Sequence, residues 1–333
     1  MVSVRVFIPT YNRHDLFPRA IKSLLNQTFI NWSAEVHNDL PNDPFPSKFI
    51  RELNDTRFKM VDHPNNIGAV STFNLFFRND IKEDFICILE DDNWLEPLFI
   101  EEMVTSMEKY KTVKVAFSNH YLWQELPNNQ WEKLPNLKYP ITENKFNFIT
   151  FPDLKHVSEY HFSNCSVFFR NTNHLEKYKI PAQTRGDFME HVRERAFPHP
   201  ILFVNTPLAN FSLTLQSYRK NTLNGYHEHE ALLLASFLNN IKPDQYFIKQ
   251  LLIKTRQGFG LGMNKIIYAA LIDKESRFLL KELKPKEYFL FALYNIRHLS
   301  NFPQVLKAKS KYKDLWNYLD LNTSKLIDND VNN

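Results

Sequence analysis

The stretch FICILEDDNWLEP, at residues 85–97, decides how the first half of this chain is to be interpreted. Its first five residues are mostly apolar and partly β-branched, which predicts a short buried strand. Three carboxylates follow without a break: Glu90, Asp91 and Asp92. Because side chains alternate faces along an extended chain, Glu90 and Asp92 can point the same way. A helix is expected to open at Leu95 and Pro97.

Paired carboxylates at the C-terminal end of a strand point to a divalent cation. Mg²⁺ and Mn²⁺ prefer such oxygen ligands, and either ion can in turn hold the phosphates of a substrate. The segment taken alone is equally consistent with a solvated acidic turn. The rest of the N-terminal half decides between these two interpretations.

Strand and helix patterns alternate over the first 120 residues. Short apolar runs predict strands at residues 4–8, 32–37, 58–61, 85–89 and 113–118. Apolar side chains at helical spacing predict helices at residues 16–25, 67–77 and 98–110. Repeated strand–helix–strand units favour a parallel sheet covered by helices on both faces. Ligands bind such sheets at the C-terminal ends of the strands, so we expect the site just after Ile8, His37 and Leu89.

The second half of the chain has a different pattern. Residues 121–160 are rich in Asn, Pro and aromatic residues, and we expect them to form long loops over the site. Strand patterns return at residues 166–169 and 201–204, and helical patterns prevail from about residue 226. We therefore expect an α/β domain at residues 1–220 and a helical extension at residues 221–333.

Composition limits the class of protein. The 333 residues are 43% hydrophobic and carry a net charge of +4, which is typical of a globular chain and gives no reason to expect a nucleic-acid partner. The two cysteines lie in apolar runs, so free buried thiols and a reducing, cytoplasmic compartment are expected. The first residues do not resemble a signal peptide, and no apolar stretch approaches the roughly 20 residues that cross a bilayer.

Six segments resemble, in order, the motifs of family 2 glycosyltransferases of the GT-A fold. They are VFIPTYNR (6–13), VHNDLPND (36–43), HPNNIGAVSTFN (63–74), ILEDDNWLEP (88–97), NCSVFFR (164–170) and GDFMEHVRER (186–195). The resemblance implies a GT-A nucleotide-diphospho-sugar transferase fold, which is an α/β fold with a Rossmann-like mixed sheet. Residues beyond about 220 carry no such resemblance, so they would form a C-terminal helical extension.

The resemblance implies a donor site at the strand ends. Its expected members are Pro9, Thr10, Tyr11, Arg13, Asp39, Asn66, Gly68, Glu90 and Asp91. An ionised Asp39 can accept a hydrogen bond from a uracil ring nitrogen, although a loop cap is an alternative role for it. Asn38 stands where the family usually has its first aspartate. Gly68 permits a positive φ or a close backbone approach.

The metal ligands and the catalytic base are also implied by the resemblance. Asp92 is expected to bind Mn²⁺ or Mg²⁺ directly and Glu90 to assist, since Glu90 stands where the family usually has Asp. Asp187 is expected to be the base that takes the proton of the attacking sugar hydroxyl, with Glu190 as the second choice. Gly186 replaces the first acid of the family's usual pair. A helix N-cap is an alternative role for Asp187.

The sequence thus predicts an inverting, metal-dependent glycosyltransferase of the bacterial polysaccharide type. It would move a hexosyl or N-acetylhexosaminyl group from a nucleotide-diphosphate sugar, with UDP favoured, to a saccharide or lipid-linked saccharide acceptor. A nucleotidylyltransferase and a non-catalytic nucleotide-sugar-binding assembly subunit are the alternatives. The C-terminal helices mix aromatic and apolar residues with Lys and Arg, which suits a membrane interface. Packing within a helical bundle or a homo-oligomer contact would also explain them.

Overall fold

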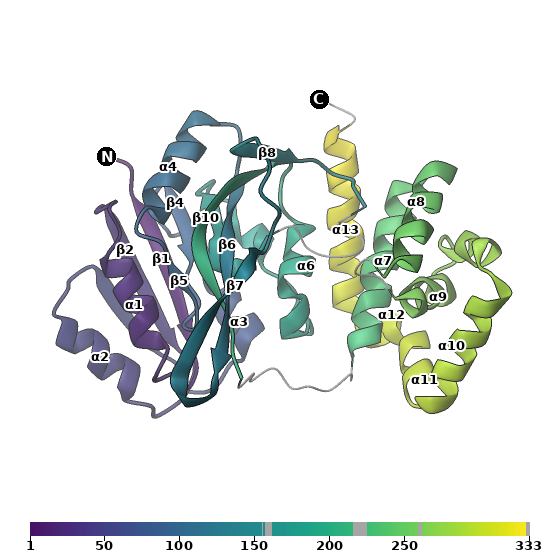
Figure 1. Cartoon of the computed structure of the whole chain (residues 1–333), viewed down its shortest axis with the longest axis horizontal. Coiled ribbons are helices and arrows are strands. Elements are labelled where there is room, and N and C mark those ends of the chain that lie inside the picture. The colour runs from purple at the N-terminus through teal and green to yellow at the C-terminus, as the bar shows by residue number, and fades with distance from the viewer. Residues whose placement is uncertain (155, 157–161, 216–224, 259–261, 331–333) are drawn as a thin grey trace. The chain divides into compact units, whose positions relative to one another are not determined.

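The computed structural model describes residues 1–154, 156, 162–215, 225–258 and 262–330 (Figure 1). The chain divides into two compact units. The first, which we call the sheet unit, comprises Met1–Thr150, Phe162–Lys179 and Phe197–Tyr218. The second, the helical unit, comprises Phe151–His161, Ile180–Ala196 and Arg219–Asn333.

The expected domain boundary at residue 220 lies next to the point, between Tyr218 and Arg219, where the chain leaves the sheet unit for the last time. Two earlier segments, 151–161 and 180–196, group with the helical unit, which a single boundary does not capture. The reason is visible in the packing, since Phe151 belongs to the same buried cluster as Leu234 and Phe237 of the helical unit.

Ten strands of the described residues form one sheet in the order β3-β2-β1-β4-β9-β6-β10-β5, with β7 beside β6 and β8 beside β10. Their bounds are β1 (Val4–Thr10), β2 (Trp32–Asn38), β3 (Phe58–Asp62), β4 (Phe85–Ile88), β5 (Trp94–Leu95), β6 (Val115–Leu126), β7 (Gln130–Leu137), β8 (Phe146–Ile149), β9 (Val167–Arg170) and β10 (Ile201–Leu213). The strands β3, β2, β1 and β4 are parallel, as predicted. Strand β9 runs antiparallel to its neighbours β4 and β6, so the sheet is mixed.

Helices connect the parallel strands and bury one face each. They are α1 (Phe17–Leu25), α2 (Phe45–Leu53), α3 (Ala69–Asn74) and α4 (Phe99–Lys109). In α1 the buried positions Ala20, Ile21 and Leu24 recur at helical spacing and pack in the main core with β1 and β2. Cys87 and Cys165 are free and buried, as expected.

Two expectations about local structure are wrong. Residues 121–160 do not form only loops, because β6 extends to Leu126 and returns as β7 after the turn η1 (Pro127–Asn129). Asn128 and Asn129 take positive φ angles of 64° and 57°, which turn the chain back. This part of the hairpin is only half-buried, so the apolar alternation that marks a strand is weak.

The residues after the acidic run form strand β5 rather than a helix, and α4 begins at Phe99.

The helical unit is an all-helical bundle in the part of the chain that the structure describes. It contains η4 (Gly186–Phe188), α6 (Met189–Glu194), α7 (Tyr226–Ile241), α8 (Gln245–Arg256), α9 (Met263–Ile272), η5 (Arg277–Glu282), α10 (Pro285–Arg297), α11 (Asn301–Leu306), α12 (Ala308–Lys311) and α13 (Lys313–Asp330). Helix α7 is buried from Ala231 to Leu238 and packs against α9 and α13. Among these described helices none is long and apolar enough to cross a membrane.

Candidate functional site

Hydrogen bonds bring the ends of β1, β2 and β4 together at one edge of the sheet. The backbone N–H of Asp39, after β2, donates to the carbonyl of Thr10 at 3.0 Å. The backbone N–H of Tyr11 donates to Oδ2 of Asp91 at 3.0 Å. Three of the expected donor-site segments therefore meet, as the parallel register predicts.

Asp91 fastens the loop after β1 rather than facing solvent. Its side chain is buried, and burial together with the neighbouring charge of Asp92 raises the pKa of Asp91 to about 7. The hydrogen bonds from the Tyr11 backbone and from the Thr10 side chain act in the opposite direction. Asp91 thus fixes the backbone that was expected to hold the nucleotide, and its predicted contact with the donor would be made through that loop.

Asp92 and Glu90 point to different partners. Oδ2 of Asp92 lies 3.7 Å from Nη2 of Arg13, and its side chain is partly exposed. Oε2 of Glu90 accepts a hydrogen bond from Nδ2 of Asn93 at 2.8 Å. Asn93 in turn accepts from the backbone of Ser212 at 2.9 Å, which ties the acidic segment to β10.

The carboxylates fit a divalent ion only if a substrate supplies further ligands. Among the described residues no group of three or more His, Cys, Asp or Glu side chains is placed to hold an ion. Mg²⁺ and Mn²⁺ sites in phosphate-handling enzymes often use one or two carboxylates, and phosphate oxygens and water complete the shell. The partly exposed Asp92 suits that arrangement, with Glu90 close to it in the same turn.

Arg19 is a site residue that sequence reasoning missed. Its guanidinium lies over two nearly perpendicular indole rings, 3.9 Å from the centre of Trp94 and 4.3 Å from that of Trp131. Its Nη2 donates to the backbone carbonyl of Asp92 at 2.7 Å and to Oγ of Ser212 at 2.9 Å. Burial lowers the pKa of Arg19 to about 10, although the negative charge of Asp92 acts to raise it. An arginine within a helix gives no sequence signal of such a role.

Asp39 holds the loop that begins α3. Its carboxylate accepts hydrogen bonds from the backbone N–H groups of Ile67 and Gly68 and from Nδ1 of His63, each at 2.9 Å. Gly68 has a φ of 81° directly before α3, as the sequence predicts for a glycine at this point. Asn66 is exposed on the same loop. Asp39 is itself buried, so its loop-holding role is established by geometry whatever it does with a ligand.

A buried chain of hydrogen bonds continues from Asp39. Nε2 of His63 lies 3.0 Å from Nδ1 of His37, and Nε2 of His37 lies 2.8 Å from Oε1 of Glu35. Arg78 binds both oxygens of Glu35, at 2.7 and 2.9 Å. Burial alone would raise the pKa of Glu35, but the hydrogen bonds from His37 and Arg78 hold it well below its usual range.

His37 and His63 therefore link Asp39 to Glu35, so these two buried carboxylates lie at the two ends of one hydrogen-bonded chain.

Replacement of Asp39 by Asn tests the loop-holding role. In Asp39→Asn one carboxylate oxygen is replaced by an NH2 group, which would face a group that itself donates a hydrogen bond. The substitution should therefore lower the free energy of unfolding by about 1–3 kcal/mol. Asp15→Asn, at an exposed position before α1, is the matched control and should change it by less than about 0.5 kcal/mol. Equal effects in urea unfolding would show that Asp39 has no special structural role.

Asp187 and Glu190 belong to the helical unit, whereas the other expected site residues lie in the sheet unit. Asp187 is partly exposed and forms a two-bond pair with Arg185, at 2.9 and 2.8 Å. It does not cap a helix, because the capping positions of η4 and α6 are Arg185 and Phe188, and neither side chain makes a capping bond. Glu190 is only 5% exposed.

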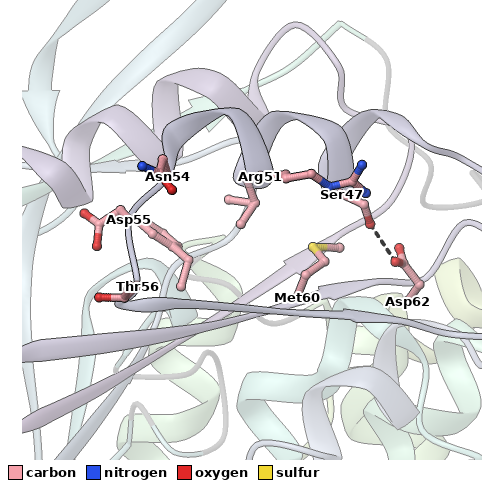
Figure 2. A pocket seen from close by; sticks show the side chains of 9 residues that line it. Ser47, Arg51, Asn54, Asp55, Thr56, Met60 and Asp62 are labelled. Atoms are coloured by element: carbon pink, nitrogen blue, oxygen red, sulfur yellow. Dashed lines mark hydrogen bonds between the residues drawn. The ribbon is translucent and has the colours of Figure 1, made fainter.

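A shallow pocket lies between α2 and β3 (Figure 2). Its volume is about 380 Å³. It is lined by Ser47, Ile50, Arg51, Asn54, Asp55, Thr56, Phe58, Met60 and Asp62. Ser47 donates to Asp62 at 2.5 Å across one end. None of the expected donor-site residues lines this pocket, so it does not bear on their function.

The model of a protein family described as Glycosyl transferase family 2 matches residues 5–174. The chain belongs to this family. The match covers the whole β1–β4 region and the acidic segment, so the family expected from the motifs is confirmed.

Curated relatives match this chain over 38–40% of its length. One is the putative colanic acid biosynthesis glycosyl transferase WcaA of Escherichia coli K12, 27% identical over 133 residues, which are 40% of this chain and 47% of that protein. Another is the E. coli UDP-Glc:alpha-D-GlcNAc-diphosphoundecaprenol beta-1,3-glucosyltransferase WfgD, 28% identical over 127 residues, 38% of this chain and 47% of that protein. The matches therefore span less than half the length of these two relatives.

Solved structures show the fold. The crystal structure of S. aureus TarS 1-349 superposes on this protein with a TM-score of 0.58 and 12% sequence identity. The match covers 97% of this chain and 92% of the TarS chain. The same protein in complex with UDP-GlcNAc has a TM-score of 0.57. The GT-A fold that the motifs imply, a mixed α/β sheet with C-terminal helices, is thus confirmed.

Proposed function

We propose that this protein is an inverting glycosyltransferase that uses a nucleotide-diphosphate sugar, with UDP favoured. The observation that carries the proposal is the meeting of three loops at one sheet edge, where Asp91 fixes the loop after β1 and Asp39 fixes the loop before α3. Family membership supports the activity. The donor named in WfgD and the UDP-GlcNAc complex of TarS support UDP.

The donor would bind to backbone and side chains that these carboxylates hold in place. Tyr11 exposes 37% of its surface beside the fixed loop, so its ring is available to a base or ribose. Asn66 and Gly68 would border the base from the other loop. Arg13, next to Asp92, offers a positive charge to the diphosphate.

A divalent ion, Mn²⁺ or Mg²⁺, belongs to this proposal. Asp92 would hold it, assisted by Glu90, and the donor diphosphate would complete its ligands. When bound, the ion neutralises negative charge on the leaving diphosphate. Arg19 and Ser212 both donate to the backbone carbonyl of Asp92, so they hold the backbone from which its side chain projects.

Thermal unfolding tests the donor site. With Mn²⁺ and UDP at about 100 times the dissociation constant, the melting temperature should rise by about 5 °C, and EDTA should reduce the rise. Asp92→Asn should remove the metal-dependent part of the shift because it loses the charged ligand. Glu52→Gln, an exposed substitution on α2, is the control and should retain the full shift. A full metal-dependent shift in Asp92→Asn would refute the ligand assignment.

Asp187 is the proposed base. It would take the proton of the acceptor hydroxyl as the new oxygen–carbon bond forms and the bond from carbon to the diphosphate oxygen breaks, so the anomeric configuration inverts. The partial exposure of Asp187 favours it over the buried Glu190, because a base must reach its substrate. The pair with Arg185 fixes the orientation of the carboxylate.

Two isosteric variants separate the candidate bases. Asp187→Asn should lower the rate of UDP release in the presence of saccharide acceptors by about 10²–10⁴-fold, because the amide cannot take the proton. Glu190→Gln should retain most of the rate. Both should keep the UDP-dependent thermal shift of the unmodified protein. The reverse order of rates would assign the base to Glu190 and refute the assignment to Asp187.

A non-catalytic nucleotide-sugar-binding subunit is the second candidate, because Gly186 stands where the family usually has an acid. Such a protein would bind UDP-sugars and release no UDP with any acceptor. A nucleotidylyltransferase should have glycines in the loop after β1, and the sequence PTYNRHDLF has none.

We propose that the acceptor is a saccharide of a growing surface polysaccharide or a lipid-linked oligosaccharide. The printed names of WcaA and WfgD, which concern colanic acid and a diphosphoundecaprenol-linked sugar, support this. A lipid-linked acceptor would place the reaction in the cytoplasm at the inner face of the membrane. A homo-oligomer contact is the competing role for the helical unit.

A further inference from the structure

Helix α10 exposes a continuous apolar face. None of its residues is buried. Phe289, Leu293 and Ile296 are 62%, 37% and 65% exposed, and they recur at intervals of four and three residues, so they share one side of the helix. Leu290, which is also exposed, widens this side, and Leu299 extends it beyond the end of the helix. We call Phe289, Leu290, Leu293 and Ile296 the α10 face.

Contacts on the opposite side fix the orientation of the helix. The ring of Phe291 packs against Tyr268 of α9 with 5.1 Å between centres. Tyr268 also donates to Asn295 at 2.6 Å. Tyr294 lies 2.6 Å from a ring nitrogen of His227 on α7. Because three residues of α10 are held by α7 and α9, the α10 face turns away from the core of the helical unit.

The charges around α10 are unevenly distributed. Residues 277–313 contain nine Lys and Arg against two Glu and no Asp, a net charge of +7 in a chain of net charge +4. Lys286 lies one turn before Phe289, and Arg297 lies one turn after Leu293, so both cations border the α10 face. The acidic Glu287 is bound by Arg256 at 2.8 Å. The exposed side of the helix is therefore apolar and basic.

We propose that the α10 face docks the protein on an anionic lipid membrane, with the helix lying in the headgroup layer. Apolar side chains would enter the acyl boundary while Lys286 and Arg297 meet lipid phosphates. A second copy of the chain fits this surface less well, because a symmetric contact would bring the same cations of both copies together. The inference deepens the proposed function, since a membrane partner suits a lipid-linked acceptor, but it rests on α10 alone.

Sedimentation with lipid vesicles tests the docking. The full chain should bind vesicles that contain phosphatidylglycerol at least tenfold more tightly than vesicles of phosphatidylcholine alone. The triple variant Phe289→Ser, Leu293→Ser, Ile296→Ser should lose at least tenfold in binding. Tyr246→Ser with Ile253→Ser, two exposed apolar positions on α8, is the matched control and should bind as the unmodified protein does.

Charge reversal separates the two parts of the interaction. Lys286→Glu with Arg297→Glu should abolish the preference for phosphatidylglycerol, because the anionic headgroups would then be repelled. Absence of binding to anionic vesicles, or equal binding by the triple variant, would overturn the proposal. A concentration-dependent dimer that the triple variant dissolves would also overturn it and assign the face to a second copy.

The same preparations distinguish this inference from the proposed function. The vesicle experiment contains no donor and no acceptor, so its outcome does not depend on catalysis. The UDP-dependent thermal shift of the triple variant should equal that of the unmodified protein, because the α10 face contains no residue of the donor site. Loss of vesicle binding with an unchanged shift supports the docking role, and a shift lost along with binding would contradict it.

Discussion

Two buried carboxylates hold the loops at the C-terminal edge of the sheet. Asp39 accepts the backbone N–H groups of Ile67 and Gly68, and Asp91 accepts that of Tyr11. Backbone groups at loops of this kind need partners, because an unpaired buried N–H costs as much as a lost hydrogen bond. A carboxylate presents two acceptor oxygens and no donor, whereas the amide of the same size presents one oxygen and an NH2 group that only donates. The shape of the proposed donor site depends on these two residues.

Each carboxylate carries a charge into the protein, and the surroundings compensate in different ways. Asp39 faces the histidine pair, which leads on to Glu35 and Arg78. Burial and the neighbouring charge of Asp92 raise the pKa of Asp91 to about 7, although two hydrogen bonds and the charge of Arg13 act in the opposite direction. The adjacent carboxylates of Asp91 and Asp92 bring negative charge together at this edge. A divalent ion in the proposed donor complex would offset part of that charge.

The sequence predicted the parts of the fold that depend on short-range patterns. The run that forms β4 is predictable because a fully buried strand leaves a continuous apolar segment. Gly68 is predictable because a positive φ restricts the choice of residue. The β6–β7 hairpin was missed because its outer half is exposed and lacks alternation. Arg19 and the pair of His37 and His63 were missed because their roles come from partners distant in sequence, which composition cannot reveal.

The way the chain passes back and forth between the two units limits how the protein can be divided. Segments 151–161 and 180–196 precede the last strand of the sheet unit, yet they belong with the helices that follow residue 219. A chain truncated near residue 220 would lack the helices that bury Phe151 and the residues around Arg193. The helical unit is therefore not a detachable appendage, and any insertion or loss within it also changes what the middle of the chain can pack against.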